Sequence, residues 1–154
     1  MPHEARAVVA GLALALAPLA AGAQESAGAA LFVQTCGVCH QADGGGTPGY
    51  APPLTGAHWR KLLAQRSYLP RVIAFGLTGQ IQVDGAVFNS GMAAQAQFSD
   101  EQLADVANFV ASALNAANLP PGWKAYDAAE VAALRATAHG SIEQRQLRKQ
   151  ALAP

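Results

Sequence analysis

The stretch ALFVQTCGVCHQADGGG, residues 30–46, decides the fold of this 154-residue chain. It holds both cysteines of the sequence, Cys36 and Cys39, and His40 directly follows the second. Two cysteines at this spacing can form a disulfide, or a thiol redox pair when a strand precedes them in a βαβ pattern. The residues upstream are alanine-rich and helix-like instead. With the adjacent histidine the pattern becomes C-x-x-C-H, which is the attachment motif of a covalently bound c-type haem.

The spacing of the motif suits a helix, which we expect over residues 29–40. Cys36 and Cys39 are then at positions i and i+3, and His40 at i+4 from Cys36 shares their face. Two thiols on one face can add to the two vinyl groups of a haem while the imidazole points at the iron. A zinc site is disfavoured, because a closed site needs four ligands and the sequence offers no second Cys or His pair at suitable spacing. The same stripe continues upstream through Ala29, Phe32 and Val33.

The first two dozen residues differ from the rest of the chain. A polar start with Arg6 is followed by an apolar run of roughly 13 residues and by Ala-Gly-Ala at 21–23. This layout predicts a secretory signal peptide over residues 1–23, cleaved after Ala23. The run is shorter than the approximately 20 residues of a membrane-spanning helix, so an uncleaved membrane anchor is the lesser alternative. The alanine-rich signal indicates export to the periplasm.

Composition excludes several function classes. The chain has 10 basic and 10 acidic side chains, and 51% of its residues are hydrophobic. These values are typical of one soluble globular domain, and they provide no basic surface that would indicate a nucleic-acid partner. No arrangement of catalytic acid, base or nucleophile stands out, so the sequence does not predict an enzyme.

The sixth position of a haem iron decides whether the protein carries electrons or binds small ligands. Met92 is the only methionine after the signal segment, and the polar, non-helical loop around it suits a ligand better than a core residue. His58 precedes the start of a helix, where it is expected to face solvent or to cap the helix. His139, in a helix-ending segment, is expected to be exposed.

Four features of the sequence together resemble class I cytochrome c. They are Cys36-Gly37-Val38-Cys39-His40, the PPLTG segment at 52–56, the lone loop methionine and a final amphipathic helix. The resemblance covers about residues 27–112. It implies an all-α class I cytochrome c fold around one haem c, attached through Cys36 and Cys39, with His40 and Met92 as iron ligands. In that family the axial histidine donates its other ring nitrogen to a carbonyl of a P-x-L-x-G segment, which here implies Pro52. Many bacterial members have proline directly after the ligand methionine, and this chain has Ala93.

The haem surroundings expected on this basis are of two kinds. Apolar side chains should bury the ring, and aromatic or basic side chains near the pocket are candidates for its propionates. The apolar candidates are Phe32, Leu54, Val72, Phe75 and Phe109. The propionate candidates are Tyr50, Trp59, Arg60 and Arg71.

The rest of the chain predicts a helical shell with one exception. Asp84-Gly85, between the alternating residues of GQIQVDGAVFNSG, predicts a short β-hairpin just before the Met92 loop. Ser99 with Gln102 predicts a capping box ahead of a helix that should pack across the first helix. The apolar stripe of that helix comprises Leu103, Val106, Ala107, Val110 and Leu114.

Three segments follow from these patterns: the signal peptide (1–23), a cytochrome c domain (24–118) and a C-terminal helical extension (119–154). In the extension, Asp127 is the expected N-cap of one helix. The last helix carries several basic residues and is expected to be a solvated helix end rather than a docking surface for an acidic partner.

The sequence leaves more than one function open. The first hypothesis is a monohaem electron carrier between exported redox partners, such as a dehydrogenase, an oxidase or another cytochrome. The second is a haem-based ligand binder or sensor in which Met92 leaves the iron readily. The third is a thiol-disulfide protein without haem.

Overall fold

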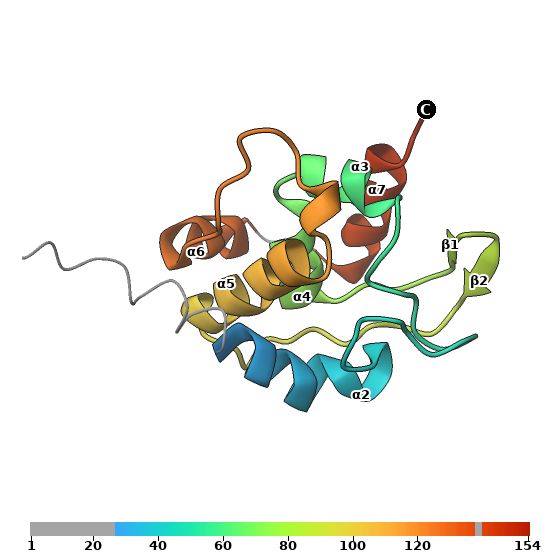
Figure 1. Ribbon diagram of the computed structural model, residues 1–154, viewed down its shortest axis with the longest axis horizontal. Helices are drawn as coiled ribbons and strands as arrows, with labels where there is room; N and C mark the ends of the chain where they lie inside the picture. The colour runs from blue at the N-terminus through green and yellow to red at the C-terminus, as the bar shows by residue number, and fades with distance from the viewer. Residues whose placement is uncertain (1–26, 138–139) are drawn as a thin grey trace, which may run out of the picture.

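The computed structural model describes residues 27–137 and 140–154, so the predicted signal peptide and His139 lie outside the described residues. The described chain is mostly helical, with one small antiparallel sheet (Figure 1). The described elements agree with the predicted all-α fold with one short hairpin. The elements are the helical residues 27–31, the π-helix η1 (Phe32–Cys36), α2 (Gly37–His40), α3 (Trp59–Ala64), α4 (Tyr68–Phe75), β1 (Ile81–Val83), β2 (Ala86–Phe88), α5 (Asp100–Asn108), the π-helix η2 (Phe109–Ala113), the 3₁₀ helix η3 (Ala116–Asn118), α6 (Ala128–Ala136) and α7 (Ser141–Ala151).

The helix expected over residues 29–40 is present, but its middle is a π-helix. The Gly37 amide donates to the Phe32 carbonyl five residues earlier. Phe32 is fully buried, whereas Val33, expected on the same stripe, is 49% exposed. The prediction for Val33 is therefore wrong. A π turn holds more residues than an α turn, so positions three and four apart no longer lie above one another.

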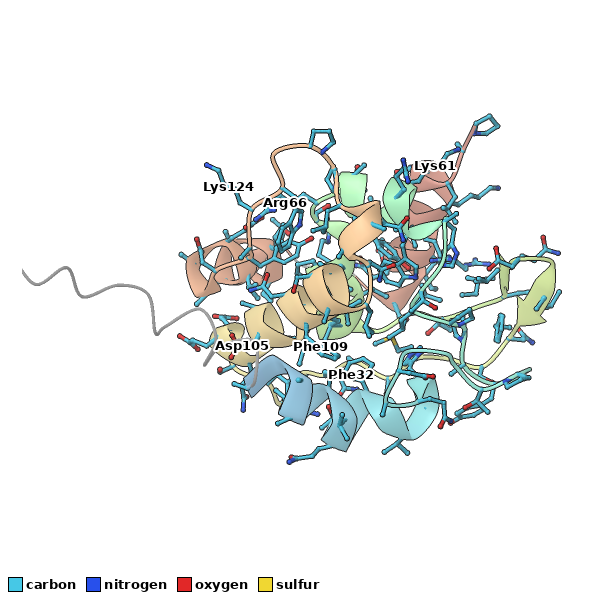
Figure 2. All side chains as sticks on the ribbon, in the orientation of Figure 1. Phe32, Lys61, Arg66, Asp105, Phe109 and Lys124 are labelled. Carbon is cyan, nitrogen blue, oxygen red and sulfur yellow. The ribbon has the colours of Figure 1, made fainter. Side chains whose placement is uncertain are left out.

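This first helix crosses the helix formed by α5 and η2, as the sequence predicts. At the crossing, a Cβ on Gly28 would collide with the backbone carbonyl of Asp105. One turn further on, the rings of Phe32 and Phe109 lie 5.0 Å apart between centroids (Figure 2). Only a glycine lets the two backbones approach this closely.

Helix α5 begins and packs as its sequence indicates. The Ser99 side chain accepts from the Gln102 amide, and the Gln102 side chain accepts from the Ser99 amide, which completes the capping box. Of the predicted stripe, Leu114 is only half-buried. The buried members are Leu103, Val106, Ala107 and Val110.

The predicted hairpin forms around Asp84 and Gly85. Strands β1 and β2 pair antiparallel, with Val83 opposite Ala86 and Ile81 opposite Phe88. Both turn residues have positive φ, 49° for Asp84 and 84° for Gly85, which is the geometry of a two-residue type I′ turn. Val83 and Phe88 point inward, and the hairpin leads the chain into the segment that carries Met92.

The C-terminal extension is packed on the body of the protein. Helix α6 lies against α5 and α4, and α7 lies against α4 and α3. Figure 1 shows α6 beside α5 and α7 beside α3. One face of α7 is buried, with Gln144 fully buried and Arg148 6% exposed. The expectation of a solvated last helix is therefore wrong, because α7 packs its Gln144 and Arg148 face against the body.

Polar contacts anchor the extension to the body. Arg66 forms a two-pronged ion pair with Glu130, with both N–O distances at 2.6 Å, and donates to the carbonyls of Lys124 and Ala125. The Lys61 ammonium donates to the Ala153 carbonyl at 2.9 Å (Figure 2). At the start of α6, the Asp127 side chain accepts from the Glu130 amide as predicted.

Within 27–137 and 140–154, no helix combines the length and hydropathy that crossing a bilayer requires.

Candidate haem site

The attachment motif lies on the wall of a cavity that is partly open to the surface. Cys36 and Cys39 are half-buried, His40 is 8% exposed, and all three line this cavity. The motif occupies the end of η1 and the whole of α2, and the chain leaves the helix at Gln41, where φ turns to 62°. The helix thus brings both thiols and the imidazole to one space, as the spacing predicts.

The His40 ring is held by a backbone carbonyl twelve residues away. Its Nδ1 lies 2.9 Å from the Pro52 carbonyl oxygen. A carbonyl can only accept, so Nδ1 carries the proton, and the lone pair of a neutral imidazole is left on Nε2. Burial lowers the pKa of His40, while the Pro52 carbonyl acts in the opposite direction. A buried, neutral imidazole fixed through its other nitrogen is the form that ligates a metal.

The glycine-rich loop positions the Pro52 carbonyl. The Gly46 amide donates to the His40 carbonyl at 2.8 Å, and the amides of Thr47 and Ala51 bond reciprocally to each other's carbonyls at 2.9 Å. Gly46 has φ 79°, and a Cβ there would lie 2.6–2.7 Å from backbone atoms of Ala51, Pro52 and Pro53. The loop therefore returns to the helix end because a glycine stands at the tightest approach.

Cys36 does not have the lowered pKa of a reactive cysteine. Cys36 and Cys39 are both free thiols in the described part of the chain. Burial raises the pKa of Cys36, the hydroxyl of Thr35 acts against this rise, and the neighbouring Cys39 adds to it. Reactive cysteines have a lowered pKa, since the thiolate is the nucleophile. The raised pKa of Cys36 disfavours the thiol-disulfide hypothesis.

Met92 lines the same cavity as His40. Its segment is held by a pair of backbone hydrogen bonds with Leu77, at 2.8 and 3.0 Å. Gly76 precedes this bridge with φ 72°, and a Cβ there would collide with the Met92 carbonyl. Met92 is half-buried, whereas Ala93 is exposed. The loop thus brings the thioether to the cavity, which also contains the imidazole.

The cavity walls are mostly apolar and include some of the predicted side chains. Phe32, Leu54 and Val72 line the cavity. Phe75 and Phe109 do not, and these two expectations are wrong. Phe109 packs against Phe32 at the helix crossing, with the two rings tilted by 45°, so its ring belongs to the helix interface.

The propionate candidates also divide. Tyr50 and Trp59 line the cavity, whereas Arg60 and Arg71 do not. Arg60 is exposed, and Arg71 lies near Glu143 of α7. Arg71 is half-buried, and burial lowers its pKa, an effect that the charge of Glu143 opposes. Neither arginine lines the cavity, because both lie on helix faces that point away from it.

His58 is neither a capping residue nor solvent-facing. Its side chain makes no capping bond at α3 and is 13% exposed, with Nδ1 3.9 Å from the Asp84 carboxylate. Burial and the charge of Arg148 lower its pKa, and Asp84 opposes this. The expectation for His58 is wrong because α7 and the hairpin cover it. It does not line the cavity.

Two polar side chains of the cavity wall were not foreseen from the sequence. Tyr68 comes from α4 and Arg148 from α7, and both line the cavity. The sequence contains a signal for Arg148. Leu147 and Ala151 are apolar residues four apart, and Gln144 and Arg148 lie on the same side of the helix at i, i+3, i+4 and i+7.

The residues present fit a haem. The cavity has a volume of about 230 Å³, and well-packed protein interiors do not leave a space of this size unfilled. Its wall holds two free thiols, an imidazole with a free lone pair and a thioether. In residues 27–137 and 140–154, no group of three or more His, Cys, Asp and Glu side chains could hold a bare metal ion.

Comparisons with known proteins agree with this geometry. The family model described as cytochrome c matches residues 25–114. Cytochrome c-552 of Thermus thermophilus is 44% identical over 112 residues, which cover 71% of this chain and 84% of that protein. The cytochrome c subunit of the quinone-type alcohol dehydrogenase of Gluconobacter oxydans is 34% identical over 91 residues. These cover 58% of this chain and 18% of that subunit.

Proposed function

This chain belongs to the cytochrome c family, and from that premise we propose that it is a monohaem carrier which passes single electrons between exported redox proteins. Members of this family bind covalently attached haem c, and the chain holds two cysteines for the attachment, Cys36 and Cys39. The haem supplies a centre that gains and loses one electron. The protein supplies its ligands, its apolar surroundings and the surface that a partner meets.

We assign a role to each residue of the site. Cys36 and Cys39 would hold the haem through thioether bonds. His40 Nε2 and Met92 Sδ would ligate its iron. The Pro52 carbonyl orients the imidazole through Nδ1, which also makes Nε2 a better donor.

One observation carries the proposal: His40 and Met92 reach the same cavity from separate segments of the chain. With both residues bound, the iron would have no open position for a small molecule. A thioether ligand and apolar walls both disfavour the additional positive charge of the oxidised iron. The site is then suited to electron transfer at a raised potential.

The proposed partners are exported redox proteins. The similarity to a cytochrome subunit of an alcohol dehydrogenase supports a dehydrogenase as donor, and an oxidase or a second cytochrome is the corresponding acceptor. Nucleic acid is not among the proposed partners, because the chain has no net charge. Membrane association is proposed only for a chain that keeps its signal segment.

Export follows from the proposed division into a signal (1–23), a cytochrome domain (24–118) and an extension (119–154). Cleavage after Ala23 leaves 131 of the 154 residues. The intact mass of the haem-bearing protein recovered from the periplasm tests this step. A mass that includes residues 1–23 would mean that the segment is not cleaved, and the proposed carrier would then be anchored to the membrane.

The carrier is tested by optical spectra of the holoprotein, oxidised and reduced, with and without carbon monoxide. We expect the wild type to have a low-spin spectrum that carbon monoxide does not change. The Met92→Ala variant should bind carbon monoxide. Ile81→Ala is the matched control, because it removes a side chain of the same cavity wall that has no ligating atom. Ready binding of carbon monoxide by the wild type would instead assign the protein to the ligand-binding or sensing class.

A further inference from the structure

Helix α7 places a buried cation against the haem cavity. Arg148 is 6% exposed and lines the cavity from the C-terminal extension. Its Nη1 donates to the Tyr68 hydroxyl at 3.1 Å. Arg148 also lies far beyond residue 114, where the match to the family model ends.

No carboxylate of the described residues pairs with the charge of Arg148. Within the described residues, its guanidinium makes one side-chain hydrogen bond and no ion pair with a carboxylate. A guanidinium has five N–H donors, and burying an unpaired charge costs several kcal/mol. Asp84, the carboxylate beside the neighbouring His58, has a side chain that is 72% exposed. The site therefore lacks an anion.

A second buried donor on the same wall also lacks a partner. Trp59 is 3% exposed and lines the cavity, and among the described residues its Nε1 has no hydrogen-bond partner. Its ring centroid lies 6.5 Å from that of Tyr68. Tyr68 accepts from Arg148 and keeps its own O–H to donate. Side chains with hydrogen-bond donors from α3, α4 and α7 thus line one wall, and among them only Arg148 Nη1 has an acceptor there.

We infer that Arg148, together with Trp59 and Tyr68, binds a propionate carboxylate of the haem, so that the C-terminal extension forms one wall of the cofactor site. A carboxylate accepts several hydrogen bonds at once and pairs with a guanidinium fork. The haem carries its carboxylates on one edge of the ring. This inference rests on haem binding in the proposed function and goes beyond it, since it gives the extension a part in the redox site.

The pairing has an electrical consequence. The positive charge of Arg148 offsets the negative charge of the carboxylate near the iron. Without Arg148, the unbalanced carboxylate favours the oxidised iron, so the reduction potential falls. Because the pair is buried, salt in the solution screens it weakly.

The experiment is a redox titration of the holoprotein at low and high ionic strength, with Arg148→Gln beside Lys149→Gln. Lys149 is the exposed neighbour on the same helix, so this control removes the same charge from solvent-facing surface. We expect a lower potential for Arg148→Gln at both ionic strengths and a smaller change for Lys149→Gln that high salt removes. Equal changes in the two variants would overturn the inference.

Two further variants decide the matter where Arg148→Gln fails to keep its haem. Arg148→Lys retains the charge and should have a potential close to that of the wild type. Trp59→Phe removes the Nε1 donor together with the five-membered ring of the indole, and it should lower the potential. Two results together would overturn the inference. In the first, Trp59→Phe has the same potential as the wild type. In the second, the potential of Arg148→Lys is no higher than that of Lys149→Gln. The readout is independent of carbon monoxide binding, so failure of the inference is distinguishable from failure of the electron-carrier assignment.

Discussion

At the scale of single residues, the glycine at position 46 controls how the Pro52 carbonyl meets the His40 ring. Its positive φ and the backbone of residues 51–53 within 2.7 Å of a Cβ leave no room for a side chain. Gly49, in the same loop, has φ 72° but open space around it. The two positions share the conformational requirement and differ only in the close approach.

This difference predicts unequal costs for Gly46→Ala and Gly49→Ala. Gly49→Ala should lower the free energy of unfolding by about 1–2 kcal/mol, the cost of a left-handed conformation for alanine. Gly46→Ala should lower it by about 1–3 kcal/mol more, because the methyl group displaces the loop backbone. Denaturant unfolding of the two holoproteins measures both. Equal losses would mean that the loop moves freely and does not hold the Pro52 carbonyl in place.

At the scale of elements, the crossing of the first helix with α5 and η2 forms the frame of the site. Both helices change to π-helical pairing at Phe32 and Phe109, the two phenylalanines that pack against each other. The Phe32 carbonyl accepts from the Gly37 amide, and the Phe109 carbonyl accepts from the Leu114 amide. A π turn re-aims the residues that follow it. The change within the first helix occurs directly before the attachment motif, so it sets the direction of the motif's side chains.

The crossing predicts opposite effects for two glycines of the first helix. Gly28→Ala should lower the free energy of unfolding by about 1–3 kcal/mol, because its Cβ meets the Asp105 carbonyl. Gly37→Ala should be neutral or stabilise by up to about 1 kcal/mol, since its Cβ finds only ordinary contacts at 3.5 Å or more and alanine is the better helix former. Thermal and denaturant unfolding check the pair. Stabilisation by Gly28→Ala would show that the two helices do not cross in close contact there.

At the scale of the whole molecule, the extension is joined to the cytochrome domain around Tyr126. This residue is 2% exposed, its hydroxyl donates to the Arg66 carbonyl, and its backbone exchanges hydrogen bonds with the Asn108 side chain. The Arg66 guanidinium lies 4.5 Å from the centre of the Tyr126 ring. The segment before α6 is therefore part of the core.

Tyr126 also predicts how stability depends on alkaline pH. Burial raises the pKa of Tyr126 from 10 to about 12, with Arg66 opposing and Glu130 adding to the rise. Between pH 10 and 12 the unfolded chain therefore loses this proton while the folded chain keeps it. The free energy of unfolding must fall as pH rises through this window, by up to roughly 3 kcal/mol from this group.

The measurement is denaturant unfolding of wild type and Tyr126→Phe at pH 7 and across pH 10–12. The variant should lose less stability above pH 10 than the wild type loses. Some loss should remain, because burial also raises the pKa of Tyr68. Parallel curves for the two proteins would show that Tyr126 is not buried in the folded protein.

The sequence by itself determined the elements whose signals are local. The C-x-x-C-H spacing, the Asp84-Gly85 turn and the Ser99–Gln102 capping box each depend on residues a few positions apart, so their chemistry can be read directly along the chain. The polar, non-helical loop around Met92 indicated a ligand rather than a core residue, and Met92 lines the same cavity as the motif. Fold class followed from these local patterns together with the resemblance that they carry.

The tertiary structure alone decided which side chains share the cavity. The sequence offered two aromatic residues and two arginines as propionate candidates. In the folded protein the two arginines, Arg60 and Arg71, do not line the cavity. Arg148 reaches the cavity because α7 packs on α3 and α4, a contact between segments some eighty residues apart in the chain. His58 is covered by the distant helix α7, and Val33 is exposed because of the π turn in the first helix. Such outcomes depend on which surfaces meet, and no local pattern of residues records that.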